Sequence, residues 1–304
     1  DPKDFNVSLN AIKNAITEKT KAIITVDISG WPCDYDAIMQ LVNSAEIKSK
    51  FKANSDYQRL LGRILVASDA AHSLGAEVNG VRAGALGDIT CFSFHAVKNL
   101  TTAEGGAICF NLPESFDHEA IYKEICIKIL HGQSKDALSK TQKGNWRYDV
   151  SEPGYKCNMT DLQAAIGLIE LERYQENLDR RTEIFRHYDE AFSQLPWAIV
   201  PPSKDDKKTS SYHLYLLRIA GVTENQRDAI IAEIFEHDVS VNVHFQPLPI
   251  LSAYKNLGYK MEDYPEAWNK YANEISLPVY FNLSDENVQK VIEAVKNSYQ
   301  KVMG

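Results

Sequence analysis

One lysine, Lys98, stands among apolar and small residues in the stretch CFSFHAVKNLTTAEGGAICF, residues 91–110. A lysine just past an apolar strand is usually a solvated surface residue. Here Ser93 and His95 share one face of the preceding strand, since strand side chains alternate. The Gly-Gly turn that follows lets the backbone come close to a ligand. An amine desolvated in such a pocket has a lowered pKa and suits Schiff-base chemistry, so Lys98 is a candidate nucleophile.

A second candidate, Asp69, ends the apolar run RILVASDA at residues 63–70. An aspartate in this position can cap the turn that follows it. It can also be a buried acid paired with a cation. The pyridinium nitrogen of pyridoxal phosphate is such a cation, and an aspartate partner keeps that nitrogen protonated.

Apolar runs and helical patterns alternate through the first 112 residues. Helices are expected at 8–17, with Ser8 as a possible N-cap, and at 34–51, with Asp34 as the cap. The expected strands are 22–28, 63–70, 87–95 and 105–111. This alternation predicts an α/β sheet that helices cover on both faces. Ligands bind at the carboxyl ends of strands in such sheets, where Asp69 and Ser93 lie.

The pattern changes to long helices after residue 112. Residues 159–195 read as one long helical stretch with a bend, and Thr160 and Asp161 can cap its start. Prolines and polar residues at 196–203 mark a boundary, and the remainder reads as a small α+β domain. We therefore predict a large domain over residues 1–180 and a smaller C-terminal domain over 181–304.

Composition excludes several classes of protein. The 304 residues carry a net charge of −8 and no basic patch, so a nucleic-acid partner is not expected. No apolar run reaches the roughly 18 residues of a membrane span, and no signal peptide is seen. The odd number of cysteines argues against a disulfide framework and against a zinc or other metal site: Cys33, Cys91, Cys109, Cys126 and Cys157. We expect reduced, mostly buried thiols in a cytoplasmic protein.

Three segments in order, SDAAHSLGA, GDITCFSFHAVKNLTTAEGGAI and EPGYKCNMTDLQAAIGLIELER, resemble the DegT/DnrJ/EryC1/StrS family of nucleotide-sugar aminotransferases. The late segment VNVHFQPLPILSAY looks like the C-terminal domain of that family. The resemblance implies a three-layer α/β/α large domain of fold type I, with a mostly parallel sheet, and a smaller α+β domain. It also implies pyridoxal 5'-phosphate as cofactor and a homodimer with shared active sites.

The resemblance implies cofactor-binding roles at four matching positions. Lys98 stands where the family has its Schiff-base lysine, and Asp69 matches the acid that faces the pyridine nitrogen. His72 falls beside the cofactor ring and its 3′-hydroxyl. Ser93 matches a serine that binds the cofactor phosphate.

Other matching positions concern the partner subunit and the substrate. In GYKCNMTD the family reaches across the dimer interface to the partner's cofactor phosphate, with Asn158 the first choice for that contact and Lys156 the second. His244 and Tyr254 lie where the family lines its sugar-nucleotide site, although His244 could also be a hydrogen-bonded histidine at a strand end. We interpret His95 as a core histidine beside the pocket.

The function expected from the resemblance is transfer of an amino group from an amino acid, usually glutamate, to a keto-sugar linked to a nucleoside diphosphate. Three alternatives stay open. One branch of the family has His at the lysine position and dehydrates sugars, which Lys98 disfavours. The fold could also serve a non-catalytic regulatory protein, or a plain α/β binding domain without cofactor.

One part of the family pattern is not found in residues 1–304. Family members carry a Gly-Thr or Gly-Ser phosphate-binding turn and a ring-stacking aromatic residue upstream of the matched region. We therefore expect the large domain to be N-terminally incomplete here and this chain to bind the cofactor weakly. The segment KANSDYQRLLG, residues 52–62, looks like an insertion. Absorbance after addition of pyridoxal phosphate would test the expectation of weak binding.

Overall fold

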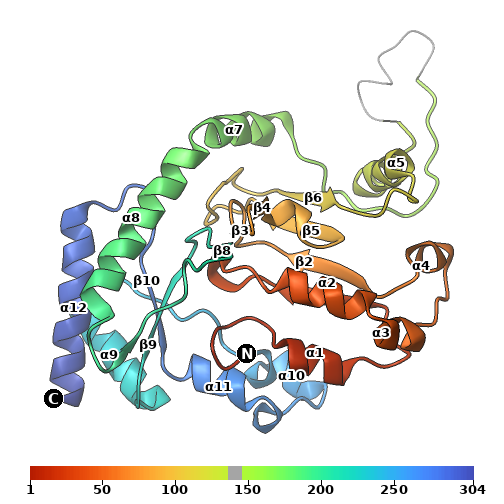
Figure 1. Cartoon of the computed structure of the whole chain (residues 1–304). Coiled ribbons are helices and arrows are strands. Elements are labelled where there is room, and N and C mark those ends of the chain that lie inside the picture. Colours follow the sequence, from red (N-terminus) through yellow and green to blue (C-terminus); the bar gives the residue numbers. More distant parts are fainter. Residues whose placement is uncertain (136–145) are drawn as a thin grey trace.

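A four-stranded sheet with the order β1–β2–β5–β6 forms the centre of the first half of the chain (Figure 1). The structure is a computed structural model and describes residues 1–135 and 146–304. The first three strands are parallel and β6 runs antiparallel to β5. The strands are β1 Ala22–Val26, β2 Leu65–Asp69, β5 Ile89–Ser93 and β6 Gly106–Phe110. The predicted α/β class with a mostly parallel sheet is confirmed.

Three helices cover one face of this sheet. They are α1 Leu9–Ala15, α2 Tyr35–Asn43 and α3 Ala45–Lys50. Ser8 caps α1, as predicted, by accepting a hydrogen bond from the Ala11 N–H. The single helix expected at 34–51 is divided at Ser44, because the Ser44 hydroxyl accepts the Ile47 N–H and starts a new helix. The core beneath these helices contains Ile12, Ile38, Val42, Ile47 and Val66.

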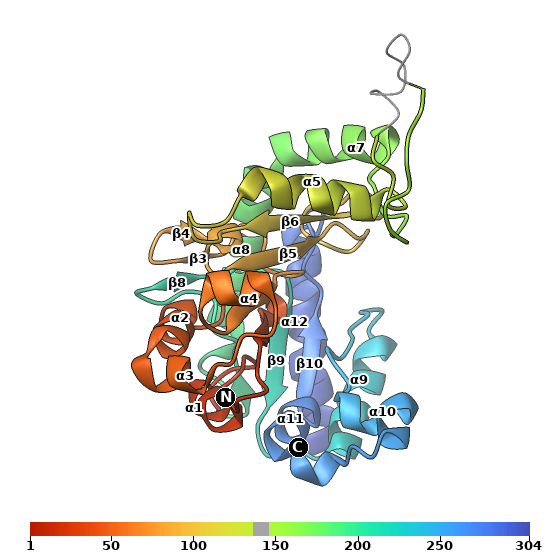
Figure 2. The same cartoon turned by 90° about the vertical axis from the view of Figure 1, so that its right-hand side faces the viewer.

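The opposite face of the sheet is partly open in the described residues. Ile24 is 74% exposed, Val26 40% and Ile108 46%. In the described residues the helices therefore cover this face less completely than the other one. The helix α5, His118–Ile129, lies next to β6 (Figure 2). Residues of β5, β6 and α5 line a cleft of about 730 Å³. The short α4, Asp56–Leu61, lies in the expected insertion.

The second half of the chain packs around a three-stranded antiparallel sheet with the order β10–β9–β7. Its core brings together side chains of α8, α9, α12 and the strands, including Phe185, Tyr215, Ile234 and Val295. The elements are α8 Tyr174–Phe192, β7 Ala198–Ile199, β9 Tyr215–Ile219, α9 Glu224–Glu236, α10 Ser252–Asn256, α11 Pro265–Tyr271, β10 Glu274–Leu277 and α12 Asp285–Met303. Together they form the small α+β unit that was predicted.

Two features connect the halves of the molecule. The long helical stretch predicted at 159–195 is α7, Asp161–Glu172, followed by α8, and the expected bend lies at Arg173. A small sheet joins β3, Glu77–Val78, and β4, Val81–Arg82, to β8, Lys208–Thr209. The predicted domain boundary after residue 180 falls inside α8 and stays a prediction.

A search of residues 1–135 and 146–304 finds no helix with the length and apolar character needed to cross a bilayer. The same residues contain no group of three or more histidine, cysteine or acidic side chains that could hold a metal ion. All five cysteines are free, and Cys33 alone among them is buried. The expectation of mostly buried thiols is therefore wrong. Cys91 is exposed because it lies on the open face of the sheet.

Candidate active site

Lys98 lies in the turn after β5 and lines a cleft of about 700 Å³. The opposite wall of this cleft comes from the small unit, through residues 240–245 and 276–280. The cleft therefore lies where the carboxyl ends of the parallel strands face the second half of the chain. Ligands bind in this location in open α/β sheets.

The amine of Lys98 is half-buried, and this burial lowers its pKa below the usual range. The carboxylate of Asp69 partly opposes the shift, since a nearby negative charge favours the ammonium form. A lowered pKa increases the fraction of neutral, nucleophilic amine at neutral pH. The arrangement thus provides an activated amine with a carboxylate close by.

Asp69 is exposed, because it lies on the open face of the sheet beside its register partners Val26 and Cys91. It also has the capping role that the sequence left open, since its Oδ1 accepts a hydrogen bond of 3.1 Å from the Ala71 N–H. This short turn fixes the carboxylate at the end of β2. The alternative of a buried acid does not hold in the described residues.

Asn99, next to Lys98, anchors the turn that carries the amine. Its Oδ1 accepts a hydrogen bond of 2.8 Å from Nδ1 of the buried His213, and its Nδ2 donates to the Ser211 carbonyl at 2.7 Å. The Asn99 carbonyl accepts a further bond of 2.9 Å from Asn177. Asn99 was not predicted as a site residue. Its position directly after the candidate lysine was the one sequence feature that could have indicated this role.

His72 lines the same cleft, and its ring lies 4.4 Å from the ring of His213. The Ser29 N–H donates to His72 Nδ1 at 3.3 Å, so the neutral ring carries its proton on Nε2. Burial lowers the pKa of His72 to about 3, and the charge of Lys98 adds to the shift. His72 therefore presents an N–H donor to a ligand at neutral pH.

The structure brings one of the two predicted substrate residues to the cleft. His244 lines it, and burial together with Lys98 lowers the pKa of its imidazole. Tyr254 does not line it, because α10 places its ring against Tyr259, with 6.1 Å between ring centroids.

The other predicted residues do not line the cleft of Lys98. Ser93 Oγ accepts a 3.3 Å hydrogen bond from the His95 N–H in the turn after β5. Lys156 Nζ donates to Asn158 Oδ1, and both residues line the separate cleft between β5, β6 and α5. His95 is exposed and lies 3.7 Å from Glu104, so its interpretation as a core histidine is wrong.

Arg181 on α8 is a buried cation at the cleft that sequence reasoning missed. It is 5% exposed, and it donates to the carbonyls of Tyr212, His213 and Val279 at 3.2–3.3 Å. Burial lowers its pKa to about 10, which still leaves it charged at neutral pH. A helix pattern rich in charged residues gives no signal for such burial. With Lys98 it makes the cleft electropositive, which favours anionic ligands such as phosphates.

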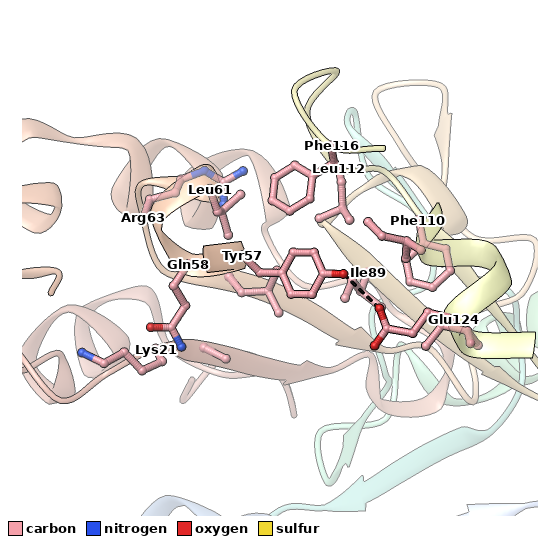
Figure 3. Close-up of a pocket in the computed structure, with 14 residues that line it drawn as sticks. Lys21, Tyr57, Gln58, Leu61, Arg63, Ile89, Phe110, Leu112, Phe116 and Glu124 are labelled. Carbon is pink, nitrogen blue, oxygen red and sulfur yellow. Dashed lines mark hydrogen bonds between the residues drawn. The ribbon is translucent and has the colours of Figure 1, made fainter. Parts of the chain in front are cut away.

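A further pocket, of about 320 Å³, lies at the amino ends of the parallel strands (Figure 3). Its lining is mainly apolar, with Leu61, Phe110 and Phe116 among the side chains. The Tyr57 hydroxyl donates to Glu124 across it at 2.9 Å. This pocket contains none of the predicted site residues and lies at the end of the sheet away from Lys98.

The donor set around Lys98 fits pyridoxal phosphate. The aldehyde needs an amine of lowered pKa, which Lys98 would supply, and the ring nitrogen needs a carboxylate, which Asp69 would supply. His72 offers a fixed N–H beside them, and Arg181 adds positive charge for the phosphate. The side chains of His72, Lys98 and Arg181 come from three different segments that line this cleft, and Asp69 lies at the end of β2, three residues before His72.

Comparison with known proteins agrees with this chemistry. The model of the DegT/DnrJ/EryC1/StrS aminotransferase family matches residues 1–51 and 59–296. The spore coat polysaccharide biosynthesis protein SpsC of Bacillus subtilis is 37% identical over 303 residues, which are 98% of this chain and 71% of SpsC.

Solved structures give the same result. One of these structures is the PMP form of Spr1654 from Streptococcus pneumoniae, which is provisionally named a sugar aminotransferase. This chain superposes on it with a TM-score of 0.95 and 44% sequence identity. The match covers 100% of this chain and 75% of Spr1654. PseC of Helicobacter pylori, an aminotransferase of pseudoaminic acid biosynthesis, gives a TM-score of 0.79 at 25% identity and covers 97% of this chain and 71% of PseC. This chain therefore belongs to the DegT/DnrJ/EryC1/StrS aminotransferase family and is a pyridoxal-phosphate-dependent enzyme.

Proposed function

We propose that the enzyme moves an amino group from an amino acid, with glutamate the expected donor, to a keto-sugar linked to a nucleoside diphosphate. The observation that carries the proposal is the half-buried amine of Lys98 beside Asp69 in an electropositive cleft. The names of SpsC and PseC, which refer to polysaccharide and pseudoaminic acid biosynthesis, support a sugar acceptor. The cleft volume of about 700 Å³ lies within the usual range for a ligand pocket.

Each side chain of the cleft has a defined task in this reaction. Pyridoxal phosphate, when bound, supplies an aldehyde that exchanges for an amine and a ring that withdraws electrons. Lys98 Nζ holds the cofactor, and once free it takes the proton from the α carbon of the amino donor. Asp69 keeps a proton on the ring nitrogen. His72 Nε2–H donates to an acceptor oxygen of the ring, and Arg181 attracts the phosphate by its charge.

We further propose that the enzyme acts as a homodimer with shared sites. Lys156 and Asn158 line a cleft on the sheet side of α5, away from Lys98 of the same chain. Next to them, α7 has no buried residue and exposes several large apolar side chains. Exposed apolar patches of this kind mark association surfaces. This location supports a role for Asn158, or Lys156, at the cofactor phosphate of a second subunit.

The test is amine transfer by the holoenzyme. It is incubated with glutamate and a panel of nucleotide-linked keto-sugars, and the release of 2-oxoglutarate is measured. Lys98→Ala should lower turnover at least about 10³-fold, because both the anchor and the proton-transfer group are lost. Lys123→Ala, an exposed lysine on α5, is the matched control and should keep full activity. Turnover retained in Lys98→Ala would overturn the assignment of Lys98.

A further inference from the structure

A buried carboxylic acid lies behind His244, on the side of the imidazole away from the cleft. Glu274 on β10 is fully buried, and its Oε2 accepts a hydrogen bond of 2.9 Å from the His244 backbone N–H. Ser276, two residues further along the strand, is hydrogen-bonded through Oγ to Glu274 Oε1 and, at 2.8 Å, to His244 Nδ1. The Ser276 hydroxyl thus joins the acid to the imidazole in one continuous chain of hydrogen bonds.

The backbone holds these three groups in register. Asn242 and Ser276 form an antiparallel bridge, in which the Ser276 N–H donates to the Asn242 carbonyl at 2.7 Å and the Asn242 N–H donates in return at 3.2 Å. His244 follows two residues later and is therefore pressed against β10. Its Nδ1 faces Ser276, so its Nε2 is the ring nitrogen available to the cleft. Within residues 1–135 and 146–304, that Nε2 has no hydrogen-bond partner.

The proton on Glu274 decides which nitrogen of neutral His244 carries a hydrogen. An ionised Glu274 accepts from the Ser276 hydroxyl, Ser276 Oγ then accepts from Nδ1–H, and Nε2 shows a lone pair to the cleft. A protonated Glu274 donates to Ser276 Oγ, the Ser276 hydroxyl donates to Nδ1, and Nε2 carries the hydrogen. The two states differ by one proton on the acid and by reversal of every bond in the chain.

The protonated state is favoured at neutral pH. Burial raises the pKa of Glu274 to about 8, against the opposing effects of Ser276, the His244 N–H and the Arg227 guanidinium on α9. Arg218 on β9 is the register partner of Glu274. Lys98 faces His244 across the cleft and disfavours the charged imidazolium, and His72 and His213 lie in the same cleft.

We propose that Glu274 and Ser276 are positioning residues that set His244 as a hydrogen-bond donor toward an acceptor oxygen of the sugar substrate, and that ionisation of Glu274 reverses this polarity. The inference rests on the proposed function, since it concerns the substrate of the same cleft. A fixed N–H donor suits an oxygen that has only lone pairs, such as the carbonyl of a keto-sugar, better than a hydroxyl.

The first test reads the tautomer of His244 directly, without turnover. Nitrogen-15 NMR of labelled holoenzyme, assigned by loss of the signal in His244→Gln, should show protonation at Nε2 near pH 7 and at Nδ1 near pH 9. In Glu274→Gln the amide has the shape of the protonated acid and donates to Ser276, so Nε2 should stay protonated at both pH values. A wild-type tautomer that does not change with pH would overturn the proposal.

The second test is kinetic. The KM for the keto-sugar should rise about three- to tenfold as Glu274 ionises, which corresponds to loss of one hydrogen bond, while kcat changes little. Glu274→Gln should remove this rise and keep the neutral-pH KM. Ser276→Ala should raise KM already at neutral pH, and Ser276→Thr, which keeps the hydroxyl, should restore it. If the KM of Glu274→Gln rises at alkaline pH as much as that of the wild type, the assignment is contradicted. The rise would then come from another group that still titrates in the variant, such as Lys98.

The two tests separate failure of this inference from failure of the proposed function. An enzyme without amine transfer to any keto-sugar, but with the pH-dependent tautomer of His244, would refute the proposed substrate and support the positioning chain. Active enzyme with a tautomer that is the same in wild type, Glu274→Gln and Ser276→Ala would support the function and refute the chain.

Discussion

Asn99 anchors the turn that carries Lys98, and its contribution to the free energy of unfolding can be measured. Replacement by alanine removes the bonds to His213 and to the Ser211 carbonyl, both inside the buried region. Each lost bond leaves a buried partner unsatisfied, so we expect Asn99→Ala to lower the free energy of unfolding by about 2–4 kcal/mol. Urea unfolding checks this value. Asn43→Ala, which loses only an exposed bond to the Met39 carbonyl, should change stability by less than about 0.5 kcal/mol.

Glu274 also gives a prediction about stability and pH. Its pKa is about 8 in the folded protein and near the ordinary value of 4.5 in the unfolded chain. The folded state therefore binds more protons between these values, and the free energy of unfolding falls as pH rises. The N-terminal amine and the buried histidines have lowered pKa values and give the opposite slope, so the contribution of Glu274 is read as the difference between the wild type and Glu274→Gln from about pH 6.5 to 8.

In that window we expect the stability of the wild type to fall by up to about 1.4 kcal/mol for each pH unit, and the decrease to level off above about pH 8. Glu274→Gln cannot ionise and should lack this decrease over the same range. Urea unfolding at a series of pH values measures both profiles. Parallel curves for the two proteins would show that Glu274 is already ionised at neutral pH.

The sequence reveals some of these residues and hides others for physical reasons. Lys98 and Asp69 were found because Asp69 ends an apolar strand and Lys98 lies in the turn after one, so local pattern alone places both near a strand end. The pair of His244 and Glu274 is separated by 30 residues, and only tertiary packing brings them together. Arg181 was missed because its charge gives a helix pattern typical of solvent exposure, although its guanidinium is buried among carbonyl groups.

At the scale of elements, the start of α7 depends on a capping box. The Thr160 hydroxyl accepts the Gln163 N–H, and the Gln163 side chain accepts the Thr160 N–H. Because α7 buries none of its side chains in this chain, packing compensates little for loss of the cap. Thr160→Ala should cost about 1 kcal/mol of helix stability, whereas Thr160→Ser should be close to wild type. Hydrogen exchange of the first turn of α7 measures the difference.

Element boundaries show how far local pattern reaches. The strands were predicted within a few residues, since continuous β-branched runs are typical of parallel sheets. The division of residues 34–51 at Ser44 was missed, because a serine in a helical pattern gives no sign that it caps a new helix. The expected burial of both faces of β1 was wrong at Ile24, since burial depends on elements that the strand sequence does not specify.

At the scale of the whole molecule, the cleft exists because two units meet. One wall comes from the turn after β5, and the other from residues around β10, more than 130 residues later. The change of pattern after residue 112 and the prolines at 196–203 predicted the two-part architecture, but no spacing in the sequence predicts that Ser276 would face Lys98 across a cleft. The relative placement of the units therefore decides which predicted residues share a site, and it separates Lys156 and Asn158 from Lys98 within one chain.

The same separation leads to a prediction about assembly. On α7, Leu162 is 81% exposed and Ile169 58% exposed, and both lie close in sequence to Lys156 and Asn158. If two subunits meet there, Leu162→Asp combined with Ile169→Asp buries unpaired carboxylates at a cost of several kcal/mol, and the dimer should dissociate. Sedimentation velocity should then show a monomer, with turnover lost because the partner's residues no longer reach the cofactor phosphate. Leu257→Asp, at a 75% exposed leucine in the small unit, is the matched control and should remain a dimer with full activity. A double variant that stays dimeric and active would place the subunit contact elsewhere.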